Sequence, residues 1–199
     1  NVINNNSIVL HNANLYPNKF EKIHAINWVV DSESGLVRSN ELLRPDSQHI
    51  VDTFGELMVR RLWGGKYLRE KIESAVTSGT NTTHRNYEIG RPIATLGPWT
   101  QIISSNILQE YFIPIEHLES FIDRLRVIRE QYSVNILNAS IRYIPADTES
   151  LLSYAPYDCF SVVLYINLVR APWVFESAQK WTRELIDAAL ACNGAYYLP

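Results

Sequence analysis

The clearest candidates for chemistry are polar side chains that alternate with apolar ones along two segments in the second half of the chain. In 134–144, Asn138, Ser140 and Arg142 share one face, and the other face carries Leu137, Ala139, Ile141 and Tyr143. In 159–168, Ser161, Val163, Tyr165 and Asn167 alternate with Phe160, Val162, Leu164, Ile166 and Leu168. This period is typical of strands, whose successive side chains point to opposite faces.

If the two strands pair side by side, their polar side chains form one hydrogen-bonding patch that includes one positively charged residue. The patch consists of Asn138, Ser140, Arg142, Tyr165 and Asn167. Antiparallel sheets commonly leave one face in water, so the alternation alone favours a solvated face over a binding site.

Glu110 is a further candidate, in a predicted strand over 100–113. Leu108, Glu110 and Phe112 share one face of this strand, and Ile107, Gln109 and Tyr111 share the other. Both sets mix apolar and polar residues, so the pattern does not tell which face carries the glutamate. Glu110 is either a charge at a sheet edge or the acid of a site.

Other chemistries lack their sequence signatures. The five histidines show no metal-ligand spacing, and no GxSxG, P-loop or GxGxxG motif occurs. Cys159 and Cys192 do not make a disulfide framework or a CxxC site. Trp63, Trp173 and Trp181 fall on the apolar phase of predicted helices, which favours a structural role in the core.

The elements that position the candidates follow from periodicity and stop signals. Helices are predicted over 115–132 and 172–192, and strands over 100–113, 134–144, 159–168 and 195–198. The order over residues 100–198 is βαββαβ, the ferredoxin-like arrangement of an antiparallel sheet with two helices on one face. The predicted class is therefore α+β.

The first half is predicted to add elements to this unit. Strands are expected over 7–11 and 23–30, turn residues over 14–18, and two helices over 47–63 and 66–78. The extra strands would extend one edge of the sheet, so residues 1–199 are interpreted as a single domain.

Composition limits the classes of function. The 199 residues carry a net charge of −3 and are 46% hydrophobic, typical of a globular protein without an electrostatic footprint for nucleic acid. No apolar run reaches the roughly 18 residues of a membrane-spanning helix. The chain starts at Asn1 without a signal-peptide pattern, and both ends look cut from something longer, so a cytoplasmic location is the default expectation.

Seven segments, in this order and spacing, resemble one family of flavoproteins. They are HNANLYP (His11–Pro17), INW (Ile26–Trp28), GGKYLRE (Gly64–Glu70), HRNYEIG (His84–Gly90), LQEYFIPIEHLESFIDRLR (Leu108–Arg126), IRYIPADTESLLSYA (Ile141–Ala155) and YYLP (Tyr196–Pro199). They resemble the C-terminal half of FAD-linked oxidases of the vanillyl-alcohol-oxidase type, which include sugar-lactone oxidases, alditol oxidases and cytokinin dehydrogenases. The resemblance implies a substrate-binding cap domain that lies over the flavin of a separate FAD-binding domain, which this chain lacks.

The family's site residues carry over in part. Its sugar-oxidase branch has a Glu-x-Arg on the strand that matches 138–142, and here the arginine is Arg142 while Ser140 stands in the place of the glutamate. Tyr165 and Asn167 stand where that branch has polar residues. The resemblance implies that Arg142 stabilises the reduced flavin or a substrate oxygen, and that Asn138, Tyr165 and Asn167 bind substrate. Ser140 argues against a polyol or lactone specificity.

Two functions follow as expectations. One is the cap of an FAD-dependent oxidoreductase, with oxygen as one acceptor; this fragment alone would be inactive, and a weak homodimer would form through the face that meets the FAD-binding domain. The other is a stand-alone ferredoxin-like binding module without enzymatic activity.

Overall fold

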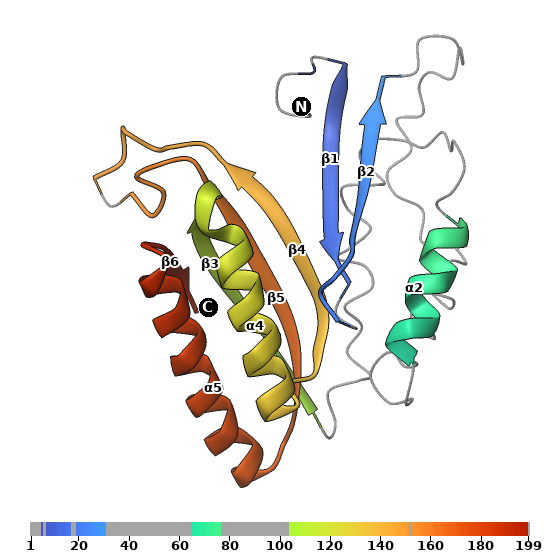
Figure 1. Ribbon diagram of the computed structural model, residues 1–199, viewed down its shortest axis with the longest axis vertical. Helices are drawn as coiled ribbons and strands as arrows, with labels where there is room; N and C mark the ends of the chain where they lie inside the picture. Colours follow the sequence, from blue (N-terminus) through green and yellow to red (C-terminus); the bar gives the residue numbers. More distant parts are fainter. Residues whose placement is uncertain are drawn as a thin grey trace, which may run out of the picture. The chain divides into compact units, whose positions relative to one another are not determined.

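The computed structural model describes Asn5 and residues 7–16, 19–30, 65–76, 104–151 and 153–198 (Figure 1). The chain divides into two compact units, one of Asn1–His11 with Asn27–Thr100 and one of Asn12–Ile26 with Gln101–Pro199. Each unit is considered by itself, and the second carries all the candidate site residues.

Among the described residues, six strands form a sheet with the spatial order β2-β1-β4-β5-β3-β6. Its strands are β1 (Ile8–Leu15), β2 (Ile23–Val29), β3 (Ser104–Pro114), β4 (Ile136–Ile144), β5 (Cys159–Val169) and β6 (Ala195–Tyr197). The pairings of β1 with β4, β4 with β5, β5 with β3 and β3 with β6 are all antiparallel. From β3 onward the order in sequence and in space is that of the predicted ferredoxin-like unit, which the structure confirms.

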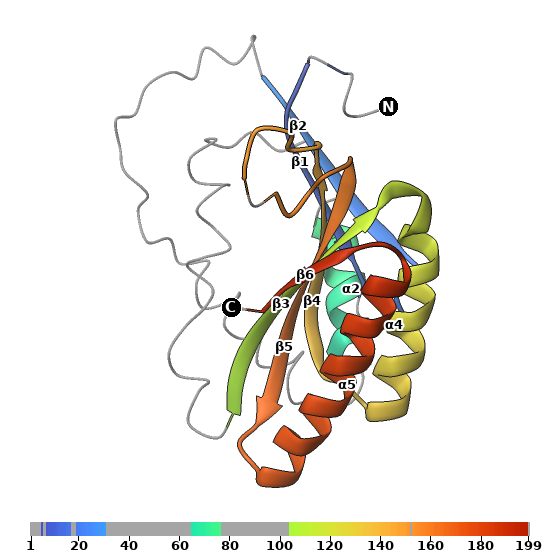
Figure 2. The same cartoon turned by 90° about the vertical axis from the view of Figure 1, so that its left-hand side faces the viewer.

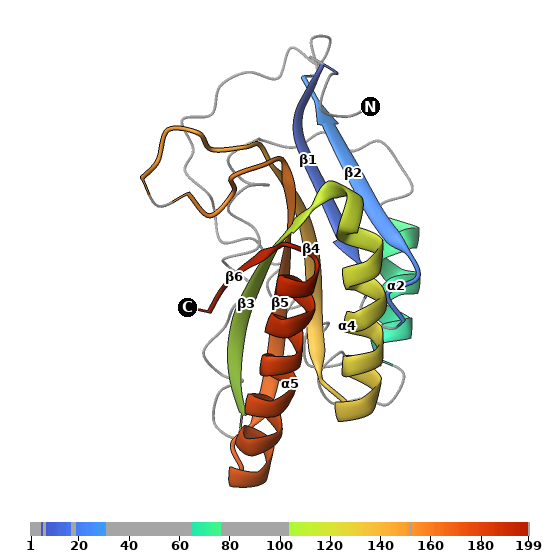
Figure 3. The same ribbon diagram turned by 60° about the vertical axis from the view of Figure 1, so that its left-hand side comes forward.

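Two helices cover one face of this sheet. The short helix η2 (Ile115–His117) leads into α4 (Leu118–Tyr132), and α5 (Pro172–Ala191) follows β5. Figures 2 and 3 show α4 and α5 side by side over β3, β4 and β5. The main core lies between these helices and the sheet, and Phe121, Leu164 and Trp181 are among its least exposed residues.

The two helices begin and end within about three residues of the predicted bounds. Pro172 occupies the first turn of α5, where a missing N–H removes no helical hydrogen bond. Ser133 ends α4 in the left-handed conformation, with φ 51°, and its amide donates to the carbonyls of the last turn. Asn193 has φ 55° just after α5, and Gly194 then leads into β6.

The first half agrees with the predictions in part. β1 reaches Leu15, so the turn expected from residue 14 starts later; Asn14 and Leu15 pair with Ser140 and Ala139, and Leu15 is buried. Pairing with β4 thus outweighs the local turn preference of these residues. Helix α2 (Gly65–Val76) lies in the other unit and matches the predicted 66–78. The helix predicted over 47–63 lies outside the described residues.

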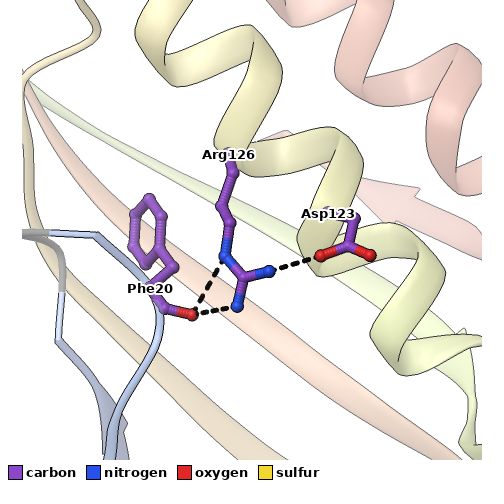
Figure 4. Close-up of polar contacts among 3 residues, drawn as sticks. All are labelled: Phe20, Asp123 and Arg126. Carbon is purple, nitrogen blue, oxygen red and sulfur yellow. Dashed lines mark hydrogen bonds and ion pairs between the residues drawn. The ribbon is translucent and has the colours of Figure 1, made fainter.

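The connection between β1 and β2 is fixed to α4 through Phe20 (Figure 4). Phe20 is buried and has φ 55°, a conformation that favours glycine. Its carbonyl oxygen accepts from Arg126 Nε at 3.2 Å and Nη2 at 2.5 Å, and Arg126 also pairs with Asp123. The Arg129 guanidinium lies 5.7 Å from the centre of the Phe20 ring. These contacts hold a backbone conformation that local preference alone disfavours.

Candidate functional site

The face of the sheet away from the helices is here called the open face. The residues that β4 contributes to it are set by an irregularity in the pairing of β4 with β5. Ile136 pairs with Ile166 and Asn138 with Tyr165, so one extra residue, Leu137, bulges out of the ladder. Ile136 and Ala139 both belong to the helix-covered core, whereas Leu137 is buried outside it. The prediction that Leu137 shares the face of Ala139 is therefore wrong, because a bulge shifts the alternation by one residue.

Beyond the bulge the register brings the candidates into cross-strand rows. Asn138 lies opposite Tyr165, Ser140 opposite Val163, and Arg142 opposite Ser161. Their neighbours along each strand, such as Ala139 and Val162, pack in the helix-covered core, so these residues themselves face the open side. Asn167 follows on the same side of β5.

The structure also tells which face carries Glu110. Gln109 Nε2 donates to Thr182 Oγ1 on α5 at 2.9 Å, and the buried Tyr111 hydroxyl donates to Gln109 Oε1 at 2.8 Å. Gln109 and Tyr111 thus lie on the helix side, and Glu110 lies on the open face. There its carboxylate accepts a hydrogen bond from Ser161 Oγ.

The open face is not the solvated surface that its polar pattern suggested. Ser140, Ser161, Val163 and Asn167 are each at most 9% exposed. Arg142 is exposed, and within the described part of the chain no carboxylate pairs with its guanidinium. One exposed cation therefore stands beside the buried hydroxyl groups of Ser140 and Ser161.

Asn167 and Tyr165 belong to a hydrogen-bonded chain across β5 and β3. Asn167 Nδ2 donates to Ser104 Oγ at 2.9 Å and to Asn106 Oδ1 at 2.8 Å, and Asn106 Nδ2 donates to the Tyr165 hydroxyl at 2.7 Å. Sequence reasoning missed Ser104 and Asn106 as members of this chain, and Ser161 as the hydrogen-bond partner of Glu110. The register between β3 and β5 reveals them, and strand periodicity within one segment contains no such information.

The connection between β4 and β5, residues 145–158, forms a strap held by two aspartates. Asp158 accepts from the Ala146 amide and from the Tyr143 hydroxyl, both at 2.8 Å. These hydrogen bonds hold the pKa of the Asp158 carboxyl below its usual range, and the bond to Asp158 raises the pKa of Tyr143. Hydrogen bonds from Ser150 and from the Glu149 amide likewise lower the pKa of Asp147.

The strap covers one end of the open face, as Figure 2 shows on the side away from the helices. The Tyr154 ring lies 4.8 Å from that of Phe112, and Ala155 and Cys159 pack with Phe112 in a second, smaller core. Burial raises the pKa of the Cys159 thiol, so this thiol stays protonated at neutral pH and is a poor nucleophile.

The open face fits part of a flavin site. An exposed guanidinium among hydrogen-bonding groups suits the carbonyl and pyrimidine edge of a flavin ring, or an anionic substrate. Among the described residues the glycines are Gly65 and Gly194, and neither belongs to a glycine-rich loop that cradles a pyrophosphate.

Comparisons with known proteins add no relative: no protein-family model, no curated protein and no solved structure matches the chain. In the described part of the chain, no group of three or more His, Cys, Asp or Glu residues has the arrangement of a metal site. Among the helices described there, none is long and apolar enough to cross a membrane.

Proposed function

We propose that this chain is the substrate-binding cap domain of an FAD-dependent oxidoreductase. The observation that supports the proposal most directly is the open face, where Arg142 stands exposed and without a carboxylate partner among the described residues, next to buried Ser140 and Ser161. The ferredoxin-like sheet beneath it is the architecture that the family resemblance implies.

In this proposal, the residues of the open face have two roles, which are charge stabilisation and substrate binding. Bound FAD supplies the chemistry, which is acceptance of a hydride from a substrate C–H bond. The positively charged guanidinium of Arg142 would stabilise negative charge that develops on the reduced ring or on a substrate oxygen. Asn138, Tyr165 and Asn167 would orient the substrate through hydrogen bonds. Molecular oxygen is one electron acceptor in this proposal. The cap would pack against the FAD-binding domain of the same protein.

The first experiment is to read the coding sequence on the N-terminal side of Asn1 and to purify the protein that it encodes. The proposal expects an FAD-binding domain in the same reading frame and a yellow protein with a flavin absorbance spectrum. A start codon next to Asn1, or a purified full-length protein without flavin, would contradict it.

In that full-length protein, we predict that Arg142→Ala keeps the fold and the flavin but slows anaerobic flavin reduction at least about tenfold in stopped-flow measurements, because removal of one preorganised donor typically costs a hundred- to a thousand-fold. Arg170→Ala is the matched control: Arg170 is also exposed, donates to Ser105 and lies just after β5. A wild-type reduction rate in Arg142→Ala would leave the open face without a catalytic role.

One observation favours the alternative, a stand-alone binding module. Asn167, Asn106 and Tyr165 already hydrogen-bond to one another, which holds β3 and β5 together here without a flavin or a substrate. Both functions expect the isolated 199-residue chain to purify colourless, and weak self-association through the open face would accompany the cap function. Tight stoichiometric FAD binding by the isolated chain, measured by flavin fluorescence, would overturn the cap proposal.

A further inference from the structure

We infer that residues 105–109 of β3, here called the outer edge, bind an extended acidic segment of a partner protein, which adds one antiparallel strand to the sheet beside α5. None of the residues proposed above to bind flavin or substrate belongs to this edge. The first observation is the short length of β6, the strand that pairs with β3 on the side away from β5.

The strand β6 covers only part of β3. Residues 110–112 pair with β6, whereas within the described part of the chain no strand pairs with the same side of the outer edge. Figure 3 shows this half of β3 at the margin of the sheet. An edge strand presents a row of backbone N–H and C=O groups to which another chain can add. The pairing with β6 already establishes the antiparallel direction of a strand at this side of β3.

The outer edge lacks the features that usually protect an edge strand. Residues 105–109 have the sequence SNILQ, without a charged residue or a proline, and their ladder with β5 has no bulge. Leu108 is 40% exposed. Natural proteins usually place charges, prolines or bulges on such edges, because a plain edge pairs readily with other chains. The outer edge is therefore suited to peptide recognition by strand addition.

A groove with a volume of about 390 Å³ adjoins the outer edge on the helix side of the sheet. It is lined by Leu198, just after β6, and by one side of α5 that includes Phe175, Thr182 and Ile186. Gln109 Nε2 donates to Thr182 Oγ1 at 2.9 Å, which joins the groove to the edge. An added strand would point every second side chain to the helix side, so an apolar one can enter the groove.

The partner segment is expected to be acidic because each end of the outer edge carries an arginine. Arg183 lines the groove beside Thr182, at the Gln109 end. Arg170 Nε donates to Ser105 Oγ at 2.9 Å, at the other end. In the part of the chain that the structure describes, no carboxylate pairs with either guanidinium, and no acidic residue lines the groove. Acidic side chains at both ends of an added strand would therefore meet an opposite charge.

The same charges disfavour a second copy of this chain as the occupant. Two antiparallel copies of the outer edge would bring the Arg183 end of one copy beside the Arg170 end of the other. Like charges that lie opposite each other in a sheet are destabilising, and the groove provides no acidic side chain to offset them. A segment with acidic ends and an apolar centre meets no such repulsion.

Peptides of defined sequence test the occupant. The probe is acetyl-Thr-Glu-Thr-Leu-Thr-Glu-Thr-amide, which as a strand has Glu, Leu and Glu on one face, and the control has Lys in place of both Glu residues. The 199-residue chain is titrated with each peptide and followed by NMR. We expect the glutamate peptide to shift the amides of the outer edge and of α5, and to bind about fivefold more tightly than the lysine peptide. Equal affinities, or shifts at Arg142 in place of the outer edge, would overturn the inference.

Strand addition also has a signature that side-chain contacts lack. Along an antiparallel strand, every second backbone N–H points to the neighbouring strand. Two further peptides are therefore compared, one N-methylated at both Glu residues and one N-methylated at the two Thr residues that flank Leu. We expect one of the two to lose binding and the other to bind like the unmethylated probe. Equal binding by both methylated peptides, whether weak or strong, would exclude strand addition.

Variants of α5 test the charge beside the groove. Arg183→Glu should reduce the preference for the glutamate peptide to within about twofold, because one of two favourable contacts becomes repulsive. Lys180→Glu is the matched control, since Lys180 is an exposed cation of the same helix outside the groove lining and the change of charge is identical. It should keep the wild-type preference. A full preference in Arg183→Glu, or the same loss in both variants, would contradict the assignment.

Sedimentation of the unliganded chain examines the other occupant. Pairing of two copies through the outer edge would be strengthened by Arg183→Glu, which removes the repulsion between the arginines, and would be unchanged by Lys180→Glu. That result would overturn the inference, whereas self-association that is alike in the wild type and both variants supports it, because such contacts do not use this edge. All these measurements are made without flavin, so they do not depend on the function proposed for the open face.

Discussion

The two faces of one strand, β5, show what burial does and does not reveal about function. Val162, Leu164 and Ile166 point into the helix-covered core, while Ser161 and Val163 point to the open face, and all five are at most 7% exposed. The faces therefore differ in the kind of contact that their side chains make and hardly in burial. Exposure alone does not mark the candidate site.

The two kinds of contact respond differently to substitution. Apolar contacts under α4 and α5 are non-directional and stabilise the fold in proportion to the area they remove from water. The hydrogen bonds of the open face depend on the positions of individual atoms, and each one contributes modestly to stability. Substitutions on the first face should chiefly lower the free energy of unfolding, and those on the second should chiefly change ligand binding.

The largest expected effect pairs two tryptophans of the same helix. Trp181 is 2% exposed and Trp173 is 72% exposed, so the predicted core position of Trp173 is wrong. We expect Trp181→Ala to lower the free energy of unfolding by about 3–5 kcal/mol, and Trp173→Ala to change it by no more than about 0.5 kcal/mol, both measured by urea denaturation. Equal losses would mean that α5 does not separate a buried from an exposed side as described.

A smaller effect is expected at Gly194, where close packing on the helix side reaches the sheet edge. A Cβ at this position would lie 2.5 Å from the Phe112 carbonyl oxygen and 3.0 Å from that of Ala189, and backbone atoms do not move aside easily. Gly194→Ala should cost about 1–3 kcal/mol, as overpacking does.

Thermal unfolding is the measurement at Gly194, and Asn193→Gly serves as the matched control. Asn193 has φ 55°, a conformation that glycine adopts freely, so this change should stay within about 0.5 kcal/mol. A neutral Gly194→Ala would show that α5 and β6 are less closely joined than the distances indicate.

The smallest expected effect concerns the strap on the open face and depends on pH. Because hydrogen bonds lower the folded-state pKa of Asp158, its contribution to stability is fully present above the ordinary pKa of 3.8 and is lost as pH falls through the folded-state value. Asp158→Asn should lower the urea midpoint slightly at pH 7 and reduce its decline toward pH 3.

Asp187→Asn, a change at an exposed aspartate of α5, is the control for this experiment. It should preserve the wild-type decline. A decline in Asp158→Asn as steep as in the wild type would mean that Asp158 does not link the strap to pH.

The fold was predictable from sequence because its signals are local and agree with one another. Apolar residues recur at helical spacing in α4 and α5, and Pro114, Pro172 and Asn193-Gly194 mark element boundaries. The site was predictable only in part. Glu110 lies on the open face because its neighbour Gln109 lies on the helix side, where it donates a hydrogen bond to Thr182. Gln109 and Thr182 are more than seventy positions apart in the sequence, so the periodicity of one strand does not reveal this contact. The core position predicted for Trp173 is wrong because helical periodicity shows which side of a helix is apolar, and does not show how far along the helix the sheet beneath it extends.

The bulge at Leu137 shifts the register between β4 and β5 by one residue. Asn138 and the residues after it pair with β5 in one register, and Ile136, which follows the turn after α4, pairs with β5 in the other. A one-residue insertion or deletion in that turn can be absorbed at the bulge without turning Ser140 and Arg142 over to the other face. The bulge thus allows the turn between α4 and β4 to change in length while Ser140 and Arg142 keep their orientation. This turn can therefore vary in evolution without a change in the candidate site.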